Sequence, residues 1–156
     1  MPNSANAIEI DNNLHQTALD YLARREHTRL TLCKKLMQKG FLPQSVEAVL
    51  DVLIQQGFLN ESRFCETFIQ KRIRQGYGPL RITTECKQYG LSNDIIFSRL
   101  PQDEEVWLTA IQKILHKKFQ PNHQPKEQLR QMHYLQYRGF TLEQIKVSQK
   151  IYLQQK

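Results

Sequence analysis

The sequence predicts an all-α protein built from three tandem three-helix repeats, about nine helices in all. The first observation is a short pattern that occurs three times, each time around a glycine: Gly40, Gly90 and Gly139. These glycines are 50 and 49 residues apart in a chain of 156, so each copy occupies about one third of the chain. Self-similarity of this period indicates a repeat array. The second observation is that period-two alternation is not sustained anywhere, so we expect no strands.

Each glycine pattern indicates a helix, a turn and a second helix. An apolar residue stands four positions before each glycine and another follows it directly, as in Leu36–Phe41. A glycine after the last apolar residue supplies the left-handed backbone that ends a helix. A new helix then begins at Pro43 in the first copy and at Ser92 in the second. In the third copy, Thr141 has the spacing of a capping box with Gln144.

Apolar stripes at helical spacing predict the remaining helices in chain order. The helix from Pro43 to the closing Gly57 carries one stripe: Val46, Val49, Leu50, Leu53 and Ile54. The next helix follows Asn60, and its stripe contains Phe64, Phe68, Ile69 and Ile73. Gly76-Tyr77-Gly78-Pro79 ends that helix and begins another at the proline.

The last third of the chain continues the same pattern. A long helix after Asp103 carries Trp107, Ile111, Ile114 and Leu115. A turn between Pro121 and Pro125 follows, and Leu129, Met132 and Leu135 then resume the helical spacing. We interpret the aromatic residues of all these helices as core. The predicted domains are a flexible N-terminus over 1–13 and three repeats over 14–58, 59–101 and 102–156.

Positive charge recurs in the first half of each repeat. Lys and Arg total 22 against 15 Asp and Glu, a net charge of +7. The clusters contain Arg24, Arg25, Arg29, Lys34, Lys35 and Lys39, then Arg63, Lys71, Arg72, Arg74, Arg81 and Lys87, and then Lys113, Lys117 and Lys118. Such clusters suit a polyanion or an acidic protein surface. The alternative is that they are ordinary solvated helix faces.

Residue patterns for catalysis, metal binding and cofactors are missing from the sequence. The Gly76-x-Gly78 pair follows no predicted strand, so it does not indicate a phosphate-binding loop. The three cysteines and five histidines have no metal-ligand spacing, and we interpret the cysteines as small buried hydrophobic residues. Asp103, Glu104 and Glu105 suit a helix N-terminus better than an active site. We therefore expect no enzyme activity, no cofactor and no metal.

The sequence also lacks signals for membranes and secretion. No apolar run approaches the roughly 20 residues that span a bilayer. The segment Met1–Asp11 has no charged-then-apolar layout typical of a signal peptide. We expect a soluble cytoplasmic protein that has no contact with membranes and is a monomer.

Several segments resemble the RecX family of regulatory proteins. The segment from Ala18 to Arg29, followed by Lys39-Gly40-Phe41, is similar to the first RecX repeat. The segments Leu59–Ile69 and Arg74–Gly90 resemble the second, and Arg138-Gly139-Phe140 resembles the third. The resemblance runs from about residue 14 to 154.

The resemblance implies a function that composition does not show. RecX proteins bind the RecA recombinase on single-stranded DNA, lodge in the groove of its helical filament, and limit its extension, strand exchange, ATP hydrolysis and coprotease activity. An elongated, curved array of three-helix units could follow such a groove. The residues we expect at the RecA or DNA interface are Arg24, Arg25, Arg29, Lys34, Lys35, Lys71, Arg72, Arg74, Arg81 and Lys87. Direct binding to single-stranded DNA should be weak and independent of sequence.

Two other functions fit the same residues. A helix, a glycine turn and a helix superficially resemble a helix-turn-helix, so the chain could bind nucleic acid without a filament partner. It could also be a helical scaffold whose basic faces are merely solvated.

Overall fold

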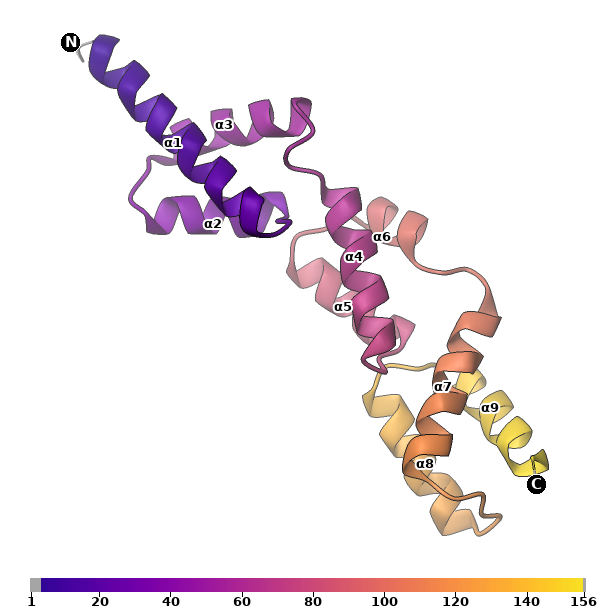
Figure 1. Ribbon diagram of the computed structural model, residues 1–156. Helices are drawn as coiled ribbons and strands as arrows, with labels where there is room; N and C mark the ends of the chain where they lie inside the picture. The colour runs from indigo at the N-terminus through magenta and orange to yellow at the C-terminus, as the bar shows by residue number, and fades with distance from the viewer. Residues whose placement is uncertain (1–3, 156) are drawn as a thin grey trace.

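The computed structural model describes the backbone of residues 4–155 and the side chains of residues 12–155. Within these residues every regular element is an α-helix, and the helices form three groups of three in an elongated row (Figure 1). The first group contains α1 (Ser4–Arg24), α2 (Arg29–Gln38) and α3 (Pro43–Gln55). The second contains α4 (Glu61–Arg74), α5 (Pro79–Gln88) and α6 (Asn93–Arg99). The third contains α7 (Glu104–Lys118), α8 (Pro125–Tyr137) and α9 (Leu142–Gln154).

Helix α1 extends further toward the N-terminus than we expected. It begins at Ser4, so residues 4–13 are helical, whereas the sequence suggested a flexible segment over 1–13. No proline or glycine stands between Ser4 and Arg24 to interrupt the helix. Residues 1–3 lie outside the described part of the chain, and the domain bounds given above stay predictions.

The predicted helix ends are confirmed. Gly40, Gly90 and Gly139 have φ of 95°, 86° and 98°, in the left-handed region that closes a helix. Ser92 caps α6 through a hydrogen bond from the Ile95 amide. The capping box predicted at Thr141 is formed with Gln144 at the start of α9.

The buried side chains form two separate cores. The core of the first group contains Leu14, Ala18, Leu32, Leu36, Val46, Val49, Leu50, Leu53 and Leu59. The second core is shared by the second and third groups, and it runs from Cys65 in α4 to Tyr152 in α9. It includes Trp107, the single tryptophan of the chain, which is 2% exposed. The first group is therefore packed as a unit of its own.

Some stripe residues lie elsewhere than predicted. Ile54 and Leu129 are 42% and 50% exposed, because each helix is covered along only part of the predicted stripe. In α4 the fully buried residues are Cys65 and Ile69. Phe68 is only half-buried, and its ring lies 5.2 Å from that of Tyr89. The interpretation of all aromatic residues as core is also wrong for Phe97 and Tyr137, which are 70% and 74% exposed.

The junction between the second and third groups is a close contact of two backbones. The Gly78 amide donates to the Arg138 carbonyl at 2.8 Å, and the Leu80 amide donates to the Gly139 carbonyl at 2.9 Å. A Cβ on Gly139 would lie 2.6 Å from the Arg81 backbone nitrogen. Glycine is required here because no side-chain atom fits between these two backbone segments. The glycine of the third repeat thus joins two groups as well as ending α8.

The junction between the first and second groups involves the corresponding glycine turn, at Gly90, but its contacts are mostly polar. The hydroxyl of Thr28 donates to the Tyr89 carbonyl at 2.6 Å, one residue before Gly90. Leu30 lies against Gly90, where an added Cβ would be 2.9 Å from the Leu30 Cβ. Glu26 and Arg63 form an ion pair across the same junction. By contrast, Gly40 has open space around it.

Replacing Leu50 with alanine should destabilise the protein by about 2–5 kcal/mol, because the side chain is fully buried in the first core. Phe68→Ala should cost less, because Phe68 is only partly buried. Chemical denaturation followed by far-UV circular dichroism measures both changes. An unchanged midpoint for Leu50→Ala would contradict its place in the core.

Candidate basic interface

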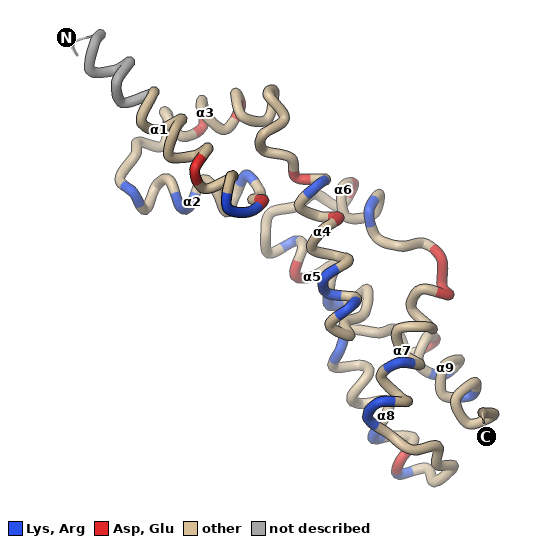
Figure 2. The backbone as a smooth tube through the Cα atoms, viewed as in Figure 1, with Lys and Arg blue, Asp and Glu red and all other residues tan. Residues whose placement is uncertain are grey.

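Six of the ten expected interface residues are exposed and make no ion pair with any carboxylate of the described residues. They are Arg24, Arg25, Lys34, Lys71, Arg74 and Lys87. Figure 2 shows basic residues on helices of all three groups. Lys35 is half-buried, and its Nζ lies 5.0 Å from the centre of the Tyr21 ring. The six exposed cations are therefore available to contact an external anion.

Local structure explains where several of these residues lie. Arg24 is in the last turn of α1, Lys71 and Arg74 are in the last turn of α4, and Lys87 is in the last turn of α5. A cation near a helix C-terminus interacts favourably with the helix dipole. Lys71 and Arg74 therefore lie near the turn at Gly76, and Lys87 lies near the turn at Gly90.

Arg29 has partners within the chain. Its guanidinium donates to Asp51 at 2.8 Å and also pairs with Glu47. Both carboxylates belong to α3, so this arginine ties the start of α2 to α3. The side chain is therefore less available to a partner molecule than the exposed arginines of α1, and its role at an interface stays a prediction.

Arg72 and Arg81 share one carboxylate, that of Glu85. Arg72 donates to its two oxygens at 2.8 and 2.6 Å, and Arg81 donates at 3.2 Å. Burial alone would raise the pKa of Glu85, but the hydrogen bonds from the two arginines outweigh it and hold that pKa below its usual range. The ring of Tyr77 lies 3.8 Å from the Arg72 guanidinium carbon and 4.5 Å from that of Arg81. This cluster holds α4 against α5.

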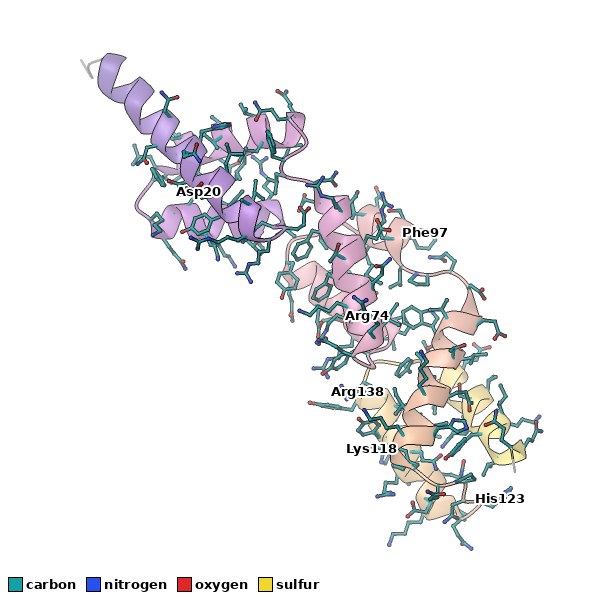
Figure 3. The ribbon with its side chains drawn as sticks, in the orientation of Figure 1. Asp20, Arg74, Phe97, Lys118, His123 and Arg138 are labelled. Atoms are coloured by element: carbon teal, nitrogen blue, oxygen red, sulfur yellow. The ribbon has the colours of Figure 1, made fainter. Side chains whose placement is uncertain are left out.

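The structure also brings together basic residues that are far apart in the sequence, including some that were not among the ten expected interface residues. Arg74, from the second group, lines a cleft of about 940 Å³ together with Lys113, Lys117, Lys118 and Arg138 from the third. Figure 3 shows Arg74, Arg138 and Lys118 along the side where α4 meets α7 and α8. The three lysines stood out in sequence as a third cluster. Arg138 was missed, and its only signal was its place directly before the repeated glycine.

His27 lies among the basic residues of the first group, and its ring is buried. Its Nδ1 lies 3.1 Å from the Thr31 hydroxyl, and its Nε2 has no hydrogen-bond partner. Burial lowers the pKa of His27, and the charges of Arg25 and Lys35 lower it further. The folded protein therefore disfavours the protonated ring.

This burial should make stability depend on pH. Because the unfolded chain binds the His27 proton more tightly, stability should fall as pH drops below about 6.5, the ordinary pKa of histidine. Denaturation midpoints measured between about pH 7.5 and 5.5 should fall less in a His27→Gln variant than in the wild type. Equal falls in both proteins would contradict the burial of a neutral His27.

Comparison with known proteins identifies the family. Residues 15–53 match the first three-helix domain of RecX, residues 60–97 match the second, and residues 104–147 match the third. The chain belongs to the RecX family. It is 40% identical over 134 residues to "Regulatory protein RecX" of Pseudomonas syringae pv. tomato, covering 85% of this chain and 86% of that protein. It is 38% identical over 137 residues to the RecX of Halorhodospira halophila, covering 86% and 85%.

Solved RecX structures share the fold. The crystal structure of RecX from Lactobacillus salivarius superposes with a TM-score of 0.85 at 16% identity, over 93% of this chain and 97% of that one. A crystal structure of regulatory protein RecX superposes with a TM-score of 0.84 at 21% identity, over 94% and 76%. The prediction of an all-α protein of three-helix repeats is therefore confirmed.

The RecX relatives are named as regulatory proteins, which supports the prediction that the chain is not an enzyme. Among the described residues there is no group of three or more His, Cys, Asp or Glu side chains placed to hold a metal ion. No helix in the described part of the chain is long and apolar enough to cross a membrane.

Proposed function

We propose that this protein binds the RecA filament on single-stranded DNA and limits its extension, strand exchange, ATP hydrolysis and coprotease activity. The observation that carries the proposal is a set of exposed cations on both of the first two groups, in a chain of three RecX domains. Among the described residues these cations form no ion pair with a carboxylate. Arg24 and Arg25 represent the first group, and Lys71 and Lys87 the second. Membership of the RecX family points to RecA as the partner, and the exposed cations provide a surface that could contact it.

The shape of the molecule suits a long, shallow binding site. The three groups lie in an elongated row (Figure 1), so they can contact a filament groove at several places. Each contact contributes little, but linked contacts raise the effective concentration of one another. A curved course of the row along the groove is part of the proposal. The protein would act in the cytoplasm as a monomer, without a cofactor.

Single-stranded DNA should bind weakly, independently of sequence and in a salt-dependent way. Counterion release predicts that log K falls with log salt with a slope of roughly −0.7 for each phosphate contacted on a single strand. Replacing one cation that touches DNA should reduce the size of that slope by about one unit or less. Fluorescence anisotropy of a labelled oligonucleotide over a salt series measures it. Binding that is insensitive to salt would contradict a phosphate contact.

Two other outcomes would favour the alternatives. Strong preference for one duplex sequence in the same assay would favour a helix-turn-helix that acts without a filament. Failure to bind either DNA or a recombinase would favour a scaffold with solvated faces. Strand exchange by the cognate RecA, measured with and without this protein, tests the proposed function itself: we expect less exchange when the protein is present.

A further inference from the structure

The cleft between the second and third groups has an aliphatic floor. Its volume is about 940 Å³, and its lining includes Ile73 at the end of α4 and Val106, Ala110 and Ile114 along α7. Ile73, Val106 and Ile114 are only half-buried. Apolar side chains therefore remain open to solvent inside a concave site, which is typical of a surface that binds another molecule.

The rim of this cleft is strongly basic. Five cations line it, namely Arg74, Lys113, Lys117, Lys118 and Arg138, against the single carboxylate of Glu105. Within the described chain none of the five forms an ion pair with a carboxylate, unlike Arg72 and Arg81 nearby. The rim thus has an excess of positive charge that no ion pair among the described residues neutralises.

The lining does not suit nucleobases. Stacking of a base on a side-chain ring needs an open aromatic residue, and Tyr134 is the one aromatic residue of the lining. The Lys118 Nζ lies 4.3 Å from its ring centre, and the Arg138 guanidinium carbon lies 5.4 Å from it. Its hydroxyl accepts hydrogen bonds from Arg138. A single DNA strand in the cleft could meet the cations but would leave the aliphatic floor uncovered.

We propose that this cleft binds an acidic peptide segment of a partner protein, with an apolar side chain anchored on the floor and carboxylates paired with the rim. Apolar anchors in a pocket and oppositely charged groups around them are the features that combine affinity with specificity at interfaces. The binding needs neither RecA nor DNA.

The probe is a labelled synthetic peptide in which leucine and glutamate recur at helical spacing, tested on the full chain by anisotropy. A second peptide has serine in place of every leucine. We expect the leucine peptide to bind at least about tenfold more tightly than the serine peptide.

Val106→Glu puts a carboxylate on the floor and should weaken binding of the leucine peptide by a similar factor. It lies in the first turn of α7, where acidic residues are favoured, so folding should survive.

The rim is tested by a matched pair of double variants. Lys113→Glu with Lys117→Glu reverses two exposed charges one turn apart on α7, and Lys146→Glu with Lys150→Glu does the same on α9, outside the cleft. The α7 variant should lose at least about tenfold in peptide affinity, and the α9 variant much less. Circular dichroism confirms that both fold.

Three results would overturn the proposal. The first is no binding of the leucine peptide to the wild type. The second is equal loss in the α7 and α9 variants, which would indicate a general charge effect. The third is an oligothymidine strand that displaces the peptide and is unaffected by Val106→Glu, which would make single-stranded DNA the occupant.

Discussion

Replacing Gly139 with alanine should destabilise the protein by about 3 kcal/mol or more, whereas the same change at Gly40 should cost only about 1–2 kcal/mol. The two glycines have nearly the same backbone conformation, with φ of 98° and 95°. A Cβ at Gly40 would meet nothing within 4 Å, but at Gly139 it would collide with the backbone of Arg81. The strain of a positive φ is therefore common to both variants. The difference between their losses of stability measures the cost of the collision at the junction between the second and third groups.

Denaturant titrations of both variants, followed by far-UV circular dichroism, give the comparison. Trp107 lies in the core shared by the second and third groups, so its fluorescence reports the unfolding of that core in the Gly139 variant. Equal destabilisation by the two changes would contradict the close contact between Gly139 and the Arg81 backbone.

Reversing charge on either of the first two groups should abolish or greatly weaken inhibition of RecA. The variants are Arg24→Glu with Arg25→Glu, and Lys71→Glu with Lys87→Glu. All four side chains are exposed and form no ion pair with a described carboxylate, so the fold should change little. Each pair should raise the concentration needed for half-inhibition by about tenfold or more, because several contacts act together.

A charge reversal elsewhere provides the control. Lys146→Glu with Lys150→Glu changes the net charge by the same amount on α9, and it should leave inhibition nearly unchanged. If all three double variants inhibit as the wild type does, RecA regulation survives but the interface residues are wrong. Arg72 is unsuitable for this test, because its loss would leave the half-buried Glu85 carboxylate with one fewer partner.

The helices and their ends could be predicted because their signals are local. Pro43, Ser92 and Thr141 act within one turn of their own positions, and the three glycines repeat with a constant phase. Apolar spacing also found the centre of each core, as at Leu50. It placed Phe68 and Leu129 too deep, because spacing shows which face is apolar but not how much of it the neighbouring helices cover.

The candidate site was harder to predict because the relevant partners are distant in sequence. Arg29 looked like any other cation, yet its carboxylates are 18 and 22 residues away on another helix. Arg138 looked isolated, yet the fold brings it to the same cleft as Arg74. The matching turns also have unequal roles: Gly90 and Gly139 touch a neighbouring group, whereas Gly40 lies in open space.

The most direct measurement is RecA-dependent ATP hydrolysis on single-stranded DNA with rising amounts of the wild-type protein, combined with filament length by electron microscopy. The proposed function predicts that hydrolysis slows and filaments shorten at concentrations of this protein below that of RecA. An unchanged rate of hydrolysis together with unchanged filament length would contradict it.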